Sequence, residues 1–360
     1  MPEIRIAQPP IQREPALTAD STAGRAGAVE SVSPIRQYLL SRGSSALADR
    51  GFRWLMVLCG LSIFVIVLLI LYALLKGSAL SWHKFGFSFF YQSFTDPDTL
   101  MKMYWDPVNE RFSALPFVYG TLVSSGLALL IAVPLAIGVA IFLTEMCPGA
   151  LRGPLAFLTE LLAAIPSVIY GFWAYTVLVP LLRQHVNPVL VRLLGWTGLF
   201  VDENPTGLGF VAAGVILSIM ILPIISSLTR EVMSAVPHSQ REAVLALGAT
   251  RWEMIRMAVL RNARIGIVGS IILGLGRALG ETMAVAMVIG NTPDIHRSLL
   301  STGSSMASVI ANEYAEAVSD MHYSALTELG LALFLVTIVV NIIAQLLVWA
   351  VTRGTPSQAR

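Results

Sequence analysis

The sequence predicts an all-α membrane protein with six transmembrane helices. Of its 360 residues, 55% are hydrophobic and only 13% are charged, and the mean hydropathy is +0.72; soluble domains carry about 25% charged residues. Six apolar runs are each long enough to cross the roughly 30 Å of hydrocarbon in a bilayer. The formal net charge of +2 provides no basic field, so the composition excludes nucleic acid as a partner.

The segments before and between these runs set the domain organisation. Residues 1–45 are rich in Pro, Ala, Ser and Arg and lack apolar periodicity, which predicts a disordered cytoplasmic tail. The membrane domain then extends over residues 50–352. Lys and Arg number 16 in the segments on one side and 7 on the other, so the positive-inside rule places both termini in the cytoplasm. The six predicted helices are 54–75, 116–143, 154–181, 208–229, 263–291 and 324–352.

The outer loop 76–112, between the first two runs, is rich in aromatic residues. Trp and Tyr are enriched where a membrane meets water, so one interpretation is an aromatic belt at the outer headgroups. The other interpretation is a docking surface for an external partner. The loop's composition alone leaves both open.

A proline interrupts the third run within the segment LLAAIPSVIYGFWA. Pro166 falls in the middle of the predicted helix, where proline removes a backbone hydrogen bond and permits a kink. A kinked helix suits a gate, although prolines also occur in static membrane helices. Ser167 and Tyr170 follow the proline and are candidates for side chains that line a substrate cavity.

The inner loop 230–264 predicts two short helices joined by a tight turn. Ser239 and Glu242 have the spacing of a capping box, in which a hydroxyl and a glutamate satisfy the first backbone N–H groups of a helix. Thr250 and Glu253 repeat that spacing. Gly248 lies between them, and glycine is the residue preferred just after a helix end. The alternative is an amphipathic loop that lies at the membrane interface.

The same loop carries a resemblance to a known family. EAVLALG, followed nine residues later by AVLRNA, resembles the EAA loop of ABC-importer permeases, with Val244 and Arg261 departing from the usual pattern. In that family the loop forms a coupling helix that fits a cleft on the ATPase subunit. The resemblance therefore assigns ATPase coupling to Glu242, Ala243, Gly248 and Arg251.

Three further blocks, at 105–125, 161–174 and 274–291, resemble the phosphate-specific importer permeases of the PstC type. This resemblance implies the type I ABC-importer permease fold in a bacterial cytoplasmic (inner) membrane. It also implies inorganic phosphate as the substrate and three kinds of protein partner. These are a second homologous permease of the PstA type, two PstB-type ATPase subunits and an external PstS-type phosphate-binding protein.

The fifth run contains two charges, Arg277 and Glu281, within GLGRALGETMAV. If the helix begins near Ala263, Arg277 lies about 21 Å along its axis at ~1.5 Å per residue, close to the bilayer midplane. An arginine there costs roughly 2.5–3.5 kcal/mol, so it must face the bundle interior or a wet cavity. Glu281 follows four residues later, which places it on the same face of a continuous helix.

Two roles for these charges remain open. The pair can be a buried ion pair that holds the helix in place. Alternatively, Arg277 meets the substrate, because a guanidinium is a planar set of donors that matches a phosphate oxyanion. Glu281 would then accept a hydrogen bond from protonated phosphate and disfavour sulfate, which has no proton to donate. Thr282 is a further candidate substrate contact.

The remaining motifs separate a transport subunit from other classes. The chain lacks the glycine-rich G-x-x-x-x-G-K-[ST] loop, so ATP hydrolysis is expected on partner subunits. It has no Ser-His, Asp-Asp or metal-ligand set, so we expect neither catalysis nor a cofactor. A permease for sulfate or molybdate remains an alternative. A proton-driven secondary transporter with Glu281 as proton carrier is another, and it would tolerate deletion of residues 239–260.

Overall fold

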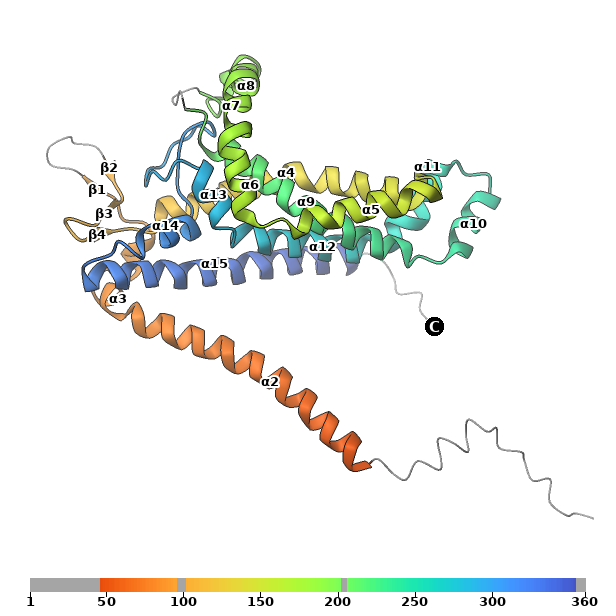
Figure 1. Ribbon diagram of the computed structural model, residues 1–360, viewed down its shortest axis with the longest axis horizontal. Helices are drawn as coiled ribbons and strands as arrows, with labels where there is room; N and C mark the ends of the chain where they lie inside the picture. Colours follow the sequence, from red (N-terminus) through yellow and green to blue (C-terminus); the bar gives the residue numbers. More distant parts are fainter. Residues whose placement is uncertain (1–45, 96–101, 202–205, 354–360) are drawn as a thin grey trace, which may run out of the picture. The chain divides into compact units, whose positions relative to one another are not determined.

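The computed structural model describes residues 46–95, 102–201 and 206–353, and these are predominantly helical (Figure 1). The predicted tail over residues 1–45 lies outside the described residues. The chain divides into two compact units, residues 1–65 and 66–360. The described part of the first unit is the beginning of the apolar helix α2 (Ala46–Gly77), and the rest of α2 belongs to the second unit.

The second unit is built from helices and two short hairpins. Strand β1 (Phe94–Thr95) pairs with β2 (Lys102–Met103), and β3 (Trp105–Asp106) pairs with β4 (Arg111–Phe112), both antiparallel. The helices are α3 (Ala79–Phe85), α4 (Leu115–Ile141), α5 (Gly149–Ala164), α6 (Ser167–Trp173), α7 (Val179–Leu181), α8 (Asn187–Leu194), α9 (Phe210–Ser234), α10 (His238–Ala246), α11 (Arg251–Met254), α12 (Arg261–Leu279), α13 (Met283–Val288), α14 (Met306–Glu313) and α15 (Asp320–Arg353).

Shorter helical segments connect several of these elements. A π-helical segment, Phe142–Met146, continues α4, and another, Ile255–Leu260, joins α11 to α12. The remaining segments are Gly86–Phe90 and Gly195–Thr197, which are 3₁₀-helical, and Ala174–Leu178 and Leu182–Val186, which are π-helical.

The helices match the predicted number of membrane crossings. Among the described residues, five helices are long and apolar enough to cross a membrane, and a sixth crossing results if one strongly bent pair is counted as a single span. The single helices are Asp49–Gly77, Leu115–Met146, Phe210–Ser234, Arg251–Gly280 and Asp320–Leu346, and the bent pair is Gly149–Ala164 with Ser167–Thr197. The prediction of an all-α membrane fold is therefore confirmed.

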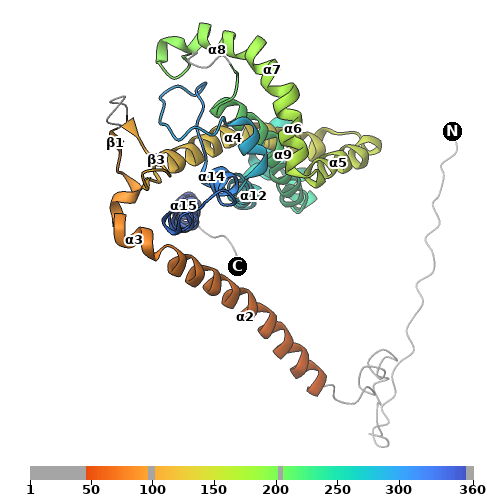
Figure 2. The ribbon, with the colours of Figure 1, turned by 60° about the vertical axis from the view of Figure 1, so that its left-hand side comes forward.

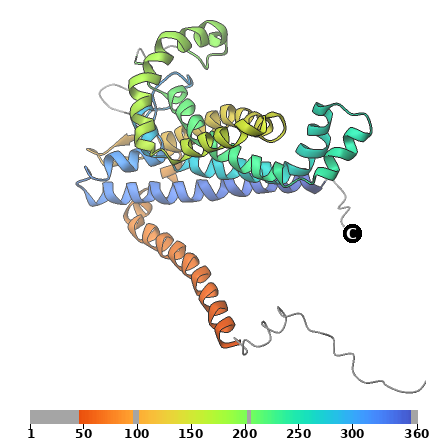
Figure 3. The same ribbon diagram turned by 45° about the vertical axis from the view of Figure 1, so that its right-hand side comes forward.

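The main core lies where α4 packs against α9, with α12 beside them (Figure 3). Helix α4 contributes three fully buried alanines at intervals of four residues, Ala128, Ala132 and Ala136, and the next alanine in this series, Ala140, is buried in a neighbouring core cluster. Small residues at this spacing form a stripe along which another backbone can approach closely. Helix α9 fills the space with larger side chains such as Ile221 and Ile225, which are also fully buried.

A second core joins the β3–β4 hairpin to α14 and α15, and Figure 2 shows α14 beside α15. Trp105 and Phe112 are buried here, and the Trp105 indole donates to Glu313 Oε2 at 2.7 Å. The ring of His322 stacks on Phe112, and its Nε2 lies 3.0 Å from the same Glu313 oxygen. Several aromatics of loop 76–112 thus serve as core residues, whereas Phe87 and Tyr91 are exposed.

Candidate functional site

The fifth span is broken at its charged residues. We predicted one helix over 263–291, but α12 ends at Leu279 and α13 begins at Met283. The break follows Gly280, which has the least side-chain support for a helix and serves here as the C-cap. The helical course also begins earlier than predicted, at Arg251, so the depth calculated for Arg277 from Ala263 does not hold.

This break separates the two charges. Arg277 is exposed in the last turn of α12, whereas Glu281 is half-buried in the link to α13. The prediction that they share one helical face is wrong, because the helix does not continue between them. The described part of the chain contains no ion pair between them, so the structural ion-pair interpretation finds no support. The Thr282 hydroxyl donates to the Gly280 carbonyl at 3.3 Å.

The third span is also broken rather than kinked. Pro166 was expected inside a helix, but it precedes the first residue of α6, and the two halves of the span meet at 91°. The residue before a proline favours extended backbone, and Ile165 accordingly has φ −68° and ψ 129°. Ser167 begins α6 and is half-buried. The buried Tyr170 donates its hydroxyl to the Leu162 carbonyl at 2.8 Å, which ties the two halves together.

The two broken spans meet through α6 and α13. The contact is tight at Gly171, where an added Cβ would lie 2.7 Å from Met287 Sδ and 2.9 Å from Ala284 Cα. Arg277, in the last turn of α12, precedes Glu281 by four residues. The structure therefore gathers the elements that carry Ser167, Tyr170, Glu281 and Thr282, with Arg277 beside them. Irregular backbone at membrane depth is tolerated where protein buries it or a cavity borders it.

Residues 230–264 form the predicted pair of short helices, α10 and α11, which we call the coupling hairpin (residues 237–254) after the role that the family resemblance implies. Its second capping box is confirmed: the Thr250 hydroxyl accepts from Glu253 N at 3.3 Å, and the Glu253 carboxylate accepts from Thr250 N at 2.8 Å. Gly248 has φ +85°, a left-handed conformation that glycine adopts readily.

The first predicted capping box is wrong. Helix α10 already begins at His238 after Pro237, and Ser239 makes no capping hydrogen bond. Pro237 is the N-cap, with the non-helical φ −59° and ψ 140° that N-cap residues typically have. Glu242 is therefore an exposed residue within the helix rather than a cap partner.

The hairpin presents a mixed surface. Glu242, Ala243, Gly248 and Arg251 are all exposed. Apolar side chains stand among them, with Leu247 88% and Trp252 61% exposed. Exposed apolar groups rimmed by polar residues are typical of a protein-binding surface.

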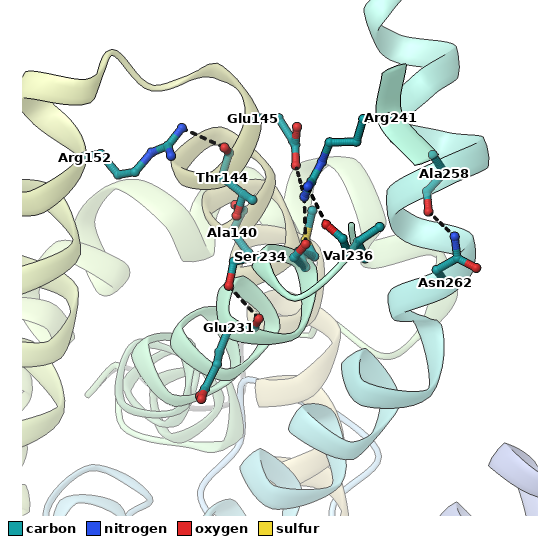
Figure 4. Close-up of polar contacts among 11 residues, drawn as sticks. Ala140, Thr144, Glu145, Arg152, Glu231, Ser234, Val236, Arg241, Ala258 and Asn262 are labelled. Atoms are coloured by element: carbon teal, nitrogen blue, oxygen red, sulfur yellow. Dashed lines mark hydrogen bonds and ion pairs between the residues drawn. The ribbon is translucent and has the colours of Figure 1, made fainter. Parts of the chain in front are cut away.

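Sequence reasoning missed the residue that anchors this hairpin. Arg241 is buried and donates to the carbonyls of Val236 at 2.6 Å and Met233 at 2.9 Å, at the end of α9 (Figure 4). It also pairs with Glu145 at 3.1 Å, just beyond α4. A signal was present: Arg241 directly precedes EAVLALG, and Glu145 is the single acidic residue at the end of a long apolar run.

A bundle of long apolar helices with an exposed, internally anchored hairpin defines a multi-pass membrane protein. The chain belongs to the family described as "Binding-protein-dependent transport system inner membrane component", whose sequence profile matches residues 132–355. This family membership confirms the prediction that the chain is a transport subunit and not an enzyme.

Relatives and a solved structure agree with that assignment. The chain is 45% identical to "Phosphate transport system permease protein PstC" of Haemophilus influenzae, over 82% of this chain and 92% of that protein. It is 44% identical to the protein of the same name from Mesorhizobium japonicum, over 82% and 88%. Its fold resembles a bacterial ABC transporter involved in the import of the acidic polysaccharide alginate. That match has a TM-score of 0.54 and 19% identity, over 86% of this chain and all of that one. The predicted ABC-importer permease fold is thereby confirmed.

Proposed function

We propose that this chain is the permease subunit of an ATP-driven importer of inorganic phosphate and forms half of its translocation pathway. The observation that carries the proposal is the similarity, over most of the chain, to two phosphate transport permeases. The geometry is consistent with an anion pathway. Arg277 stands at a break in an apolar span, and its guanidinium has no hydrogen bond or ion pair among the described residues.

The pathway residues have distinct proposed roles. Arg277 attracts the anion, because guanidinium stays charged at any working pH and offers several donors to phosphate oxygens. Glu281 accepts a hydrogen bond from the O–H of protonated phosphate and repels sulfate, which has no proton to donate. Thr282 and Ser167 are hydroxyl contacts from the two broken spans. Tyr170 shapes the pathway through its bond across the α5–α6 break.

The proposed complex includes a second homologous permease of the PstA type, two PstB-type ATPase subunits and an external PstS-type phosphate-binding protein. The exposed face of the coupling hairpin, with Glu242, Ala243, Gly248 and Arg251, fits the ATPase cleft. ATP binding closes the ATPase pair, moves the hairpins, and switches the pathway between outward-open and inward-open. This arrangement requires the hairpin, and therefore both termini, on the cytoplasmic side of a bacterial inner membrane.

The test is uptake of labelled phosphate at low external concentration in cells that supply the partner subunits. Arg277→Gln should lower uptake by about tenfold or more, since it removes a charge-assisted contact. The matched control is Arg256→Gln, which changes an exposed arginine in the π-helical segment Ile255–Leu260 and should retain uptake. Retained uptake by Arg277→Gln at equal membrane levels would remove Arg277 from the pathway. Sulfate uptake without phosphate uptake by the native chain would reassign the substrate.

Glu281 is tested by selectivity rather than by rate. Glu281→Gln should reduce the preference for phosphate over sulfate, because the amide donates hydrogen bonds and no longer repels an unprotonated anion. The measurement is competition by sulfate in the same uptake assay. An unchanged preference would show that Glu281 does not discriminate the two anions.

A further inference from the structure

A pocket of about 510 Å³ is lined in part by α5, the first half of the broken third span. Helix α5, helix α9 and the π-helical end of α4 form its walls. For a membrane protein its lining is highly polar, with two arginines, two glutamates and three hydroxyl side chains. The lining includes Thr144, Arg152, Glu160, Arg230, Glu231 and Ser234.

The two arginines come from different helices, and each uses only one of its terminal nitrogens in a contact within the protein. Arg152 donates from one terminal nitrogen to the Thr144 carbonyl at 2.8 Å. Arg230 contacts Glu160 Oε1 at 2.7 Å, again through one terminal nitrogen. A guanidinium has five N–H donors. Within the described residues each arginine therefore keeps most of its donors available for a ligand in the pocket.

The Arg230–Glu160 pair is weakly held. The side chain of Glu160 is 55% exposed and that of Arg230 24% exposed. Ion pairs this open to solvent contribute little to stability, so an incoming anion can displace the carboxylate. Glu160 then swings into water and leaves two arginines facing the anion, with Glu231 as the remaining carboxylate of the lining.

We propose that this pocket binds a phosphate oxyanion at the cytoplasmic end of the pathway, with Arg152 and Arg230 as ligands and Glu160 as an internal competitor. The inference rests on the proposed function, which supplies the cytoplasmic orientation. Because Glu160 competes with phosphate for Arg230, the affinity of the pocket for phosphate stays low. An exit site requires low affinity, since it must release imported phosphate. Ligand pockets commonly measure 300–1,000 Å³, and this volume accommodates a hydrated phosphate ion.

Two residues of the pocket lining, Thr144 and Ser234, are drawn in Figure 4 near Glu145 and Arg241, which anchor the coupling hairpin. Thr144 directly precedes Glu145, which pairs with Arg241 of the hairpin. Ser234 directly follows Met233, whose carbonyl accepts from the same arginine. A change in the position of the hairpin therefore moves the backbone that borders the pocket.

The test measures protection of Arg152 from phenylglyoxal, an arginine reagent, by peptide mass spectrometry in the assembled importer in maltoside detergent. Inorganic phosphate should slow modification of the native protein. Glu160→Gln should lower the half-protecting phosphate concentration about two- to fivefold, because it removes a weak competitor. Arg230→Gln should raise it about tenfold or more, because it removes a charged ligand.

The opposite signs distinguish a binding site from a structural ion pair, since both variants break the pair and a structural role would shift protection in the same direction. Glu110→Gln, which breaks the exposed Lys84–Glu110 pair elsewhere, is the matched control and should change nothing. The absence of phosphate protection in the native protein would overturn the proposal. So would protection that appears only in phospholipid nanodiscs and does not respond to inorganic phosphate, because the occupant would then be a lipid headgroup.

Phosphate uptake, measured in parallel on the reconstituted native importer, separates the two proposals. Uptake without protection of Arg152 would refute the pocket and leave the proposed function standing. Protection without uptake would support the anion pocket and refute the proposed function.

Discussion

Arg241 combines burial with three acceptors, and its removal would leave the buried Glu145 carboxylate without its charged partner. Breaking a buried ion pair from one side costs about 3–5 kcal/mol. Arg241→Ala should therefore destabilise the coupling hairpin by roughly 3 kcal/mol. Faster hydrogen exchange of the α10 amides in the purified complex would report this loss.

The control for Arg241 is Arg256→Ala, which removes an exposed arginine from the same region. Exposed substitutions of this kind usually change stability by less than about 0.5 kcal/mol. If both variants showed native exchange rates in α10, the anchoring role of Arg241 would be refuted.

Asp106 gives the β3–β4 hairpin a dependence on pH. Its carboxylate accepts from the Asn109 side chain at 2.7 Å and from the Val108 and Asn109 backbone, and these bonds hold the pKa of Asp106 below its ordinary value of 3.8. Because the folded-state pKa is depressed, the stabilisation is complete above about pH 4 and disappears as the pH falls through the folded-state pKa.

Amide exchange at Val108 and Asn109, corrected for intrinsic rates, should therefore accelerate at acid pH in the native protein. Asp106→Asn should abolish that acceleration, because an amide does not titrate in this range. Identical pH profiles for the two proteins would contradict the role assigned to the carboxylate.

At the residue scale the sequence predicted side chains whose roles follow from local rules. Thr250, Glu253 and Gly248 were assigned correctly, since capping and left-handed turns depend on residues only a few positions apart. Arg241 was missed, because its partner Glu145 lies 96 positions away. The prediction that Arg277 and Glu281 lie on one helical face was wrong, because α12 ends between them and an apolar sequence does not show where a membrane helix ends.

At the scale of elements, the two breaks depend on the fit of α6 against α13. Gly171→Ala should destabilise the protein by about 1–3 kcal/mol, since a methyl group would collide with Met287 and the backbone of Ala284. Thermal unfolding and phosphate uptake of the assembled importer would both decrease.

Gly138→Ala on α4 is the matched control for Gly171. Nothing lies within 4 Å of the added Cβ there, and alanine favours a helix more than glycine does by about 1 kcal/mol. Stability equal to native in both variants would show that the α6–α13 contact tolerates a larger residue.

The sequence predicted the existence of the helices better than their ends. Six apolar runs correspond to five single helices and one bent pair. Pro166 correctly indicated where the third span is interrupted. The 91° bend itself depends on tertiary contacts, including the hydrogen bond from the Tyr170 hydroxyl to the Leu162 carbonyl. The burial of Trp105 and Phe112 was not predicted, because it arises from packing against α14 and α15.

At the scale of the whole molecule, the proposed importer depends on the exposed tip of the coupling hairpin. Leu247→Asp should sharply reduce co-purification of the ATPase subunits, because Leu247 is 88% exposed and a charge there would oppose burial in an apolar cleft. The permease itself should remain folded, since the side chain is not part of its core.

Val108→Asp is the control for assembly, since Val108 is 90% exposed on the β3–β4 hairpin. It should leave ATPase co-purification intact. Normal recovery of the ATPase with Leu247→Asp would mean that this tip does not contribute to the proposed interface.

The anchored hairpin has a consequence for the thermodynamics of assembly. Its turn, its cap and the Arg241 contacts form within this chain alone. A segment that folds only on contact must lose conformational entropy at that moment, which lowers the affinity. This hairpin is already ordered, so binding of the proposed ATPase requires little folding. Calorimetry should accordingly give a heat-capacity change that corresponds to the interface area alone, with no additional contribution from ordering of the chain.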